Sequence, residues 1–169
     1  MIPIRVRQFP SFAKQMLVRS QVLRRRISDN PTFYLCFFSC HSYFRYLYCS
    51  LHSLASLTPS VRFKVVLFND NEMPISAAQI AAIQALIPGT RIIDWPKSMG
   101  WGNLQIERIW QAYALVAKDC NDEDIIARVD SDVFFFNDRI FRMVERSDAD
   151  LIGDGHFVNF QYAQGGCYF

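Results

Sequence analysis

Apolar blocks alternate with amphipathic stretches along the chain, and this order predicts strands that each lead into a helix. Four apolar runs, rich in β-branched and aromatic residues, are typical of strands buried on both faces. They lie at residues 33–38, 63–68, 91–95 and from 125 onward. Strands that alternate with helices predict an α/β fold with a mostly parallel sheet and helices on both faces.

The helices are predicted from apolar residues that recur every three or four positions. The first starts near Tyr43, the second starts at Ser76 with Gln79 completing a capping box, and the third is expected to be capped by Asn103. A short helix is expected after its cap, Asp138. The predicted inward positions are Phe44, Leu47, Leu51 and Leu54, then Ile80, Ile83 and Ile87, then Ile106, Ile109, Trp110, Tyr113 and Val116, and finally Ile140, Phe141 and Val144.

Composition adds a division of the chain into an arm and a domain. Its 169 residues are 51% hydrophobic, which suits one packed domain and excludes a disordered protein. Residues 1–28 hold seven of the eighteen basic residues and no acidic one. We therefore expect a basic arm, 1–30, and a domain, 31–169. The arm could contact an anionic membrane, with a solvated helix or a mitochondrial-type presequence as alternatives, and we expect no nucleic-acid partner.

The location of the protein is expected to be cytoplasmic, with peripheral contact at the inner face of a membrane. The arm has no signal-peptide core, and no stretch reaches the length of uncharged apolar residues that a membrane span needs. The five cysteines are scattered and form no Cys-x-x-Cys pair, so we expect reduced thiols and no zinc framework.

Candidate chemistry is concentrated where the fourth predicted strand ends, at Asp130 and Asp132. Alternation along the strand is expected to send both carboxylates to the same side. Two hard oxygen ligands with room for water and phosphate oxygens suit Mg²⁺ or Mn²⁺. The alternative is an Asp-Ser-Asp turn without a ligand. In parallel α/β sheets, ligands bind at the edge formed by the carboxyl ends of the strands. Polar residues also lie at or after the ends of the other predicted strands, and these are Ser39, His41, Asn69, Asp70 and Asp94.

The residues around this pair resemble the GT-A glycosyltransferases, the nucleotide-diphospho-sugar transferase superfamily. Asp130-Ser131-Asp132 matches the Asp-x-Asp motif of that superfamily, with an apolar strand expected on either side. The opening of the domain is similar to family 2 members, with a Leu- and Ser-rich helix (residues 51–54) and a second strand that ends in an acidic turn at Asp70. The resemblance covers residues 32–169 and implies a Rossmann-like GT-A fold.

The resemblance also implies an activity, which is transfer of a sugar from a nucleotide-diphosphate sugar to a glycan, lipid or protein acceptor, as in cell-envelope glycan biosynthesis. The cofactor would be Mn²⁺ or Mg²⁺. Asp132 would contact the cation directly, and Asp130 would assist through the cation or the ribose. Asp70 would face the base, and Ser39 and His41 would line the nucleoside pocket.

Two further segments carry candidate ligands. Gly100 and Gly102 precede Asn103 and Arg108, and backbone N–H groups at a helix start can bind phosphate; a structural turn is the alternative. Asp154 and His156, expected on a glycine-flanked loop, are candidates for catalytic groups that reach the acceptor or the metal, although a structural histidine is the commoner case. Arg128 precedes the carboxylate pair, where a salt bridge is the alternative to a phosphate contact.

Other classes remain open at this point. A nucleotidyltransferase of the same architecture would need a glycine-rich phosphate loop after the first strand, which residues 39–42 do not provide. Two classes are disfavoured: a haloacid-dehalogenase phosphatase would carry Asp-x-Asp after the first strand, but here three strands precede it, and a dinucleotide-binding domain would need Gly-x-Gly-x-x-Gly after the first strand, where it is absent. The chain stops where glycosyltransferases continue into the acceptor region. The resemblance therefore implies a truncated domain, with inversion or retention undecided, or a catalytically incomplete binding or assembly domain.

Overall fold

The computed structural model describes residues 31–57, 61–96, 105–146, 153–157 and 161–168. For residues 105–106 and for the last two ranges it describes the backbone alone. The predictions for the basic arm, for the loop at 100–102 and for the Asn103 cap lie outside the described residues.

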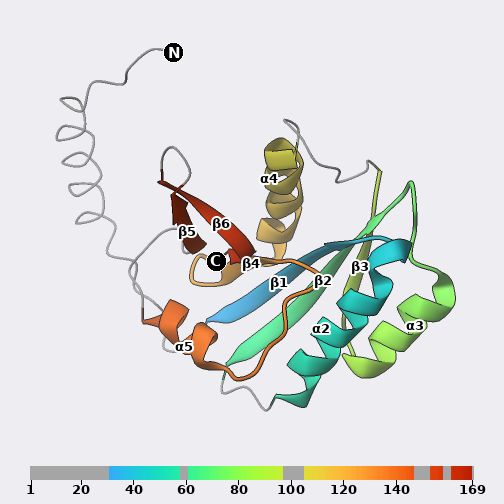
Figure 1. Ribbon diagram of the computed structural model, residues 1–169, viewed down its shortest axis with the longest axis horizontal. Helices are drawn as coiled ribbons and strands as arrows, with labels where there is room; N and C mark the ends of the chain where they lie inside the picture. The colour runs from blue at the N-terminus through green and yellow to red at the C-terminus, as the bar shows by residue number, and fades with distance from the viewer. Residues whose placement is uncertain (1–30, 58–60, 97–104, 147–152, 158–160, 169) are drawn as a thin grey trace.

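A mixed sheet with the strand order β3-β2-β1-β4-β6-β5 organises the described residues (Figure 1). Its parallel part is formed by β1 (Thr32–Ser39), β2 (Arg62–Asp70), β3 (Arg91–Trp95) and β4 (Ile125–Val129). Next to β4 lies β6 (Gln161–Tyr168), which is antiparallel to both β4 and β5 (Gly153–Phe157). The four apolar runs therefore form parallel strands, as predicted, and the parallel order brings their carboxyl ends to one edge.

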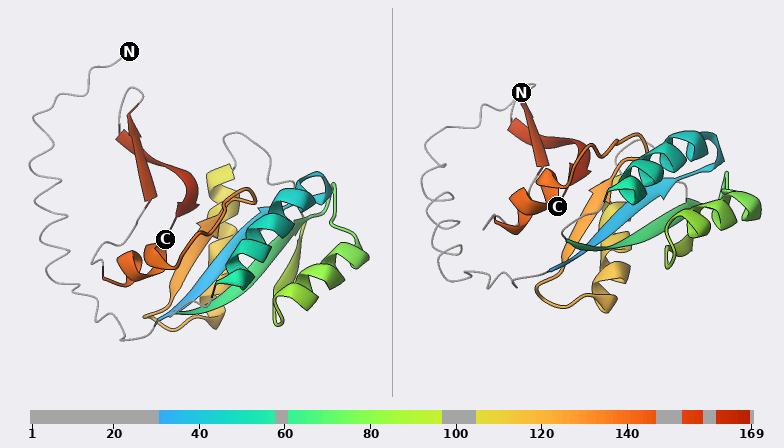
Figure 2. Two further views of the ribbon diagram at one scale, coloured as in Figure 1. Left: turned by 60° about the horizontal axis from the view of Figure 1, so that its bottom comes forward. Right: turned by 90° about the horizontal axis from the view of Figure 1, so that it is seen from below.

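Helices cover both faces of the sheet. On one face lie α2 (Phe44–Ser56), α3 (Ala77–Leu86) and α5 (Arg139–Glu145), and on the other lies α4 (Gln105–Val116) (Figure 2). Alternation along the strands divides the core accordingly. The first core includes Phe33, Leu35 and Phe37 with Leu47, Leu51, Leu54, Ile83 and Phe141. The second includes Tyr34, Cys36, Val66 and Phe68 with Ala112 and Val116.

Local signals explain where α3 begins and ends. The Ser76 hydroxyl accepts the N–H of Gln79 at 3.3 Å, and the Gln79 side-chain oxygen accepts the N–H of Ser76 at 3.0 Å, which confirms the capping box. Gly89, with a φ of 83°, follows the helix. None of the described helices has the length and apolarity that crossing a membrane requires.

The structure corrects three details of the predicted elements. Trp110 is 65% exposed on α4, so it does not belong to the inward stripe; Val116 is buried as predicted, and Ala112, which was not predicted, is buried as well. Residues 133–136 form no strand after β4. Asp138 precedes α5, but its side chain makes no capping hydrogen bond, because it pairs with Arg142 one turn later.

Candidate functional site

Asp130 and Asp132 lie in a tight turn directly after β4. The strand ends at Val129, and the N–H of Val133 donates to the carbonyl of Asp130 at 3.2 Å, which closes the turn. Between them Ser131 is buried, and its hydroxyl donates to the carbonyl of Phe38 on β1 at 3.3 Å. The two carboxylates therefore take their directions from this turn, and the expected strand alternation does not apply to them.

Three charges meet at this turn. A guanidinium nitrogen of Arg128 lies 2.6 Å from Oδ1 of Asp130, in a pair whose side chains are 20% and 35% exposed. Burial raises the pKa of the Asp130 carboxyl, the positive charge of Arg128 lowers it, and the negative charge of Asp132 raises it again. Asp132 itself is exposed. The two carboxylates are thus close enough to repel each other, and Arg128 offsets part of that repulsion.

The donor set fits a hard divalent cation, although it is incomplete on its own. Carboxylate oxygens are preferred ligands of Mg²⁺ and Mn²⁺, and a cation would relieve the repulsion between the pair. Within the part of the chain that the structure describes, no group of three or more His, Cys, Asp or Glu side chains could hold a metal. Asp130 and Asp132 would therefore hold a cation together with water and phosphate oxygens, the usual arrangement for Mg²⁺.

A row of polar side chains crosses the ends of β1, β2 and β3. The strand register aligns Ser39 with Asn69, and Asn69 with Asp94. The Asn69 amide nitrogen donates to Oδ1 of Asp94 at 2.9 Å, and the Asn69 amide oxygen accepts the N–H of Ile75 at 2.8 Å. Asn69 therefore fixes the loop that leads from β2 into α3.

Asp70 and His41 are held by neighbouring turns. Asp70 is buried, and its Oδ1 accepts the N–H groups of Glu72 at 2.8 Å and Met73 at 3.4 Å. His41 is exposed; its backbone N–H donates to the carbonyl of Met73, and its Nδ1 lies 3.1 Å from the side-chain oxygen of Gln79. Both side chains lie at the predicted edge, with Asp70 directed into its own turn.

Buried polar atoms without partners also occur at this edge. The hydroxyl of Ser39, the last residue of β1, and the indole nitrogen of Trp95, the last residue of β3, have no hydrogen-bond partner within the described residues. Both residues are buried. The sequence singled out Ser39 but not Trp95, because a tryptophan at a strand end carries no signal of whether its N–H is paired.

The remaining candidates lie on α4, on β5 or outside the described residues. Arg108 lies in the first turn of α4 and is partly exposed, whereas Asn103 is outside the described residues. Asp154 and His156 lie on strand β5 and not on the expected loop. That strand is separated from β4 by β6, a lateral distance of about 10 Å at ordinary strand spacing.

Comparison with known proteins gives a similarity at the level of structure. No known protein family and no curated protein sequence matches the chain. Among solved structures, the galactosyltransferase LgtC, crystallised in complex with donor and acceptor sugar analogues, is similar with a TM-score of 0.56 and 17% identity. The match covers 80% of this chain and 56% of the galactosyltransferase, so this chain spans little more than half the length of that enzyme. At this identity the similarity establishes the fold, an α/β fold consistent with the Rossmann-like GT-A type.

Proposed function

We propose that this chain is a metal-dependent glycosyltransferase domain that binds a nucleotide-diphosphate sugar at the carboxyl ends of its parallel strands. The observation that carries the proposal is the carboxylate pair after β4, in a fold shared with a galactosyltransferase. Parallel α/β sheets bind ligands at this edge, because the strand ends and the loops that follow them meet there.

The chemistry follows from the charges at the turn. Asp130 and Asp132 would hold a divalent cation, which would supply Lewis-acid neutralisation of the diphosphate leaving group. Asp132 is exposed and offers its carboxylate as a direct ligand. Asp130 is half-buried in the turn and offers the second carboxylate. Ser39 offers a buried hydroxyl without a partner in the described residues, at the end of the adjacent strand.

The decisive experiment compares the wild type with Asp132→Ala by calorimetry, using Mn²⁺ together with UDP- and GDP-sugars. We expect the wild type to bind one of these nucleotides only when Mn²⁺ is present. The affinity of the variant for the nucleotide in the presence of Mn²⁺ should fall by roughly a hundredfold or more. Removing a residue that only hydrogen-bonds to a metal ligand already lowers metal affinity by about 10–100-fold, and Asp132 would be a ligand itself. Because Asp132 is exposed, the free energy of unfolding of the variant should differ from that of the wild type by less than about 0.5 kcal/mol.

Glu123→Ala is the matched control, because Glu123 is an exposed carboxylate in the turn before β4, at the opposite end of the same strand. It should leave nucleotide binding unchanged. Nucleotide binding that survives Asp132→Ala, or that proceeds equally well without Mn²⁺, would remove the proposed role of the carboxylate pair.

A further inference from the structure

Arg128 occupies one of the two carboxylates that a cation would need. It lies on β4 two residues before Asp130, and the two side chains form an ion pair of 2.6 Å. Only 20% of the Arg128 side chain and 35% of the Asp130 side chain are exposed, so water screens this pair less than it screens a surface pair. A divalent cation that approaches Asp130 therefore meets a positive charge already in contact with the same carboxylate.

The need for this positive charge differs between the free and the bound site. In the free protein Arg128 offsets the repulsion between Asp130 and Asp132. A divalent cation would take over that task. A sugar nucleotide then brings a diphosphate, and its negative charges require a new cationic partner. A guanidinium is permanently charged, and its planar fork of donors matches phosphate oxygens, which makes Arg128 suited to that second position.

We propose that Arg128 is a positioning residue that exchanges partners: it neutralises Asp130 in the free protein, and it moves to the diphosphate when the cation takes Asp130. This inference rests on the proposed function, since it requires the same carboxylate pair to hold the cation. The exchange forms and breaks ion pairs only, and the negative charges at the turn keep a positive partner at each stage.

The first test separates two effects of opposite sign in the variant Arg128→Gln. Mn²⁺ binding without nucleotide, measured from the electron paramagnetic resonance signal of free Mn²⁺, should become about fivefold tighter, because a competing charge pair of this size is removed. Binding of UDP or GDP at saturating Mn²⁺, measured by calorimetry, should become about tenfold weaker, because a charged hydrogen-bond donor to phosphate is lost.

Arg142→Gln is the matched control, because Arg142 on α5 forms an ion pair of the same length, 2.6 Å, with Asp138, which precedes that helix. It should change neither Mn²⁺ affinity nor nucleotide affinity. A purely structural role of Arg128 would lower both affinities together. That result, or an unchanged Mn²⁺ affinity in Arg128→Gln, would overturn the exchange.

A second measurement uses the wild type and so does not depend on a variant that folds. The guanidinium resonance of Arg128 in nuclear magnetic resonance spectra, assigned through the backbone, should shift on addition of Mg²⁺ and shift again on addition of nucleotide, whereas that of Arg142 should not move. The Arg128 resonance could stay unchanged on addition of Mg²⁺ while nucleotide binding still depends on the cation and on Asp132. That result would contradict the exchange of partners and would leave the proposed function intact. If nucleotide binding depends neither on the cation nor on Asp132, both the exchange of partners and the proposed function are wrong.

Discussion

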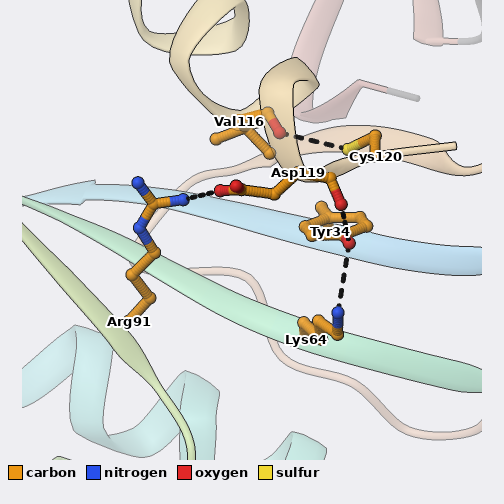
Figure 3. A network of polar contacts seen from close by, with 6 residues as sticks. All are labelled: Tyr34, Lys64, Arg91, Val116, Asp119 and Cys120. Atoms are coloured by element: carbon orange, nitrogen blue, oxygen red, sulfur yellow. Dashed lines mark hydrogen bonds and ion pairs between the residues drawn. The ribbon is translucent and has the colours of Figure 1, made fainter.

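The two ends of the parallel sheet differ in how completely their polar groups are paired by hydrogen bonds and ion pairs. At the amino end the polar groups satisfy one another (Figure 3). The Tyr34 hydroxyl donates to the carbonyl of Asp119 at 2.7 Å and accepts from the Lys64 amine at 3.1 Å, while Arg91 pairs with the carboxylate of Asp119. At the start of β4, Asp124 accepts the N–H groups of Thr32 and Asn121, both at 2.9 Å.

At the carboxyl end the side chains of Asn69 and Asp70 are hydrogen-bonded, but other polar groups are left without such partners. Two carboxylates repel each other beside one guanidinium, and the Ser39 hydroxyl and the Trp95 indole N–H are buried without a hydrogen bond in the described residues. Unpaired polar groups lower the stability of a fold, and such groups cluster at functional sites. The difference indicates that the polar network at the amino end stabilises the sheet, whereas the carboxyl end holds buried polar groups and neighbouring carboxylates that the described residues do not fully pair.

The comparison predicts that a carboxylate at the amino end contributes to stability and not to binding. Asp124→Ala removes the acceptor for two backbone N–H groups, one of them at the start of β1. We expect the free energy of unfolding, measured by urea denaturation, to fall by about 2 kcal/mol, the scale of hydrogen bonds to a charged group. Mn²⁺-dependent nucleotide binding should not change. If Asp124→Ala weakened nucleotide binding and left the free energy of unfolding unchanged, the proposed difference between the two ends of the sheet would be contradicted.

The contribution of Asp124 should also depend on pH. Burial alone would raise the pKa of its carboxyl, but the N–H groups of Asn121 and Thr32 outweigh burial and lower the pKa from 3.8. Because the pKa is lower in the folded state, this stabilisation is present above the unfolded value and is lost as the pH falls through the folded value. The difference in unfolding free energy between the wild type and Asp124→Ala should therefore shrink below a pH of about 3.8.

A smaller effect is expected from Tyr34→Phe, which keeps the buried ring and removes the hydroxyl that joins Lys64 to Asp119. The free energy of unfolding should fall by about 1 kcal/mol, the net value of an ordinary hydrogen bond. Tyr46→Phe is the control, because Tyr46 is exposed. Equal stabilities of the two variants would show that the amino-end network contributes little.

The sequence was sufficient for the parts of the fold that depend on local or short-range patterns. Strands buried on both faces are continuous apolar runs, and the capping box that starts α3 involves only Ser76 and Gln79. The strand expected at 133–136 failed for a tertiary reason. The N–H of Phe135 donates to the Ser53 hydroxyl of α2, and the Phe135 side chain is buried in the core on the α2 face of the sheet.

The candidate site was predictable to the same degree. The spacing of Asp130 and Asp132 after an apolar strand marked their position at the end of β4, whereas their role as metal ligands stays a prediction from residue type. The pairing of Arg128 with Asp130 was one of two open alternatives, because it depends on how the chain turns after Val129. The exposure of Trp110 was not predictable from helical spacing, since a periodic stripe does not reveal which of its members meets the sheet.

The smallest expected effect tests whether the carboxyl end gives up stability. Ser39→Ala deletes a buried hydroxyl that has no partner in the described residues, so the free energy of unfolding should rise by about 0.5 kcal/mol. Ser53→Ala is the same chemical change at a buried hydroxyl that donates to the carbonyl of Ser50 and accepts the N–H of Phe135, and it should lower stability by about 1–2 kcal/mol. Thermal and urea unfolding of both variants measure the contrast. Equal losses would mean that the Ser39 hydroxyl is satisfied in solution, and the two ends of the sheet would then not differ at this position.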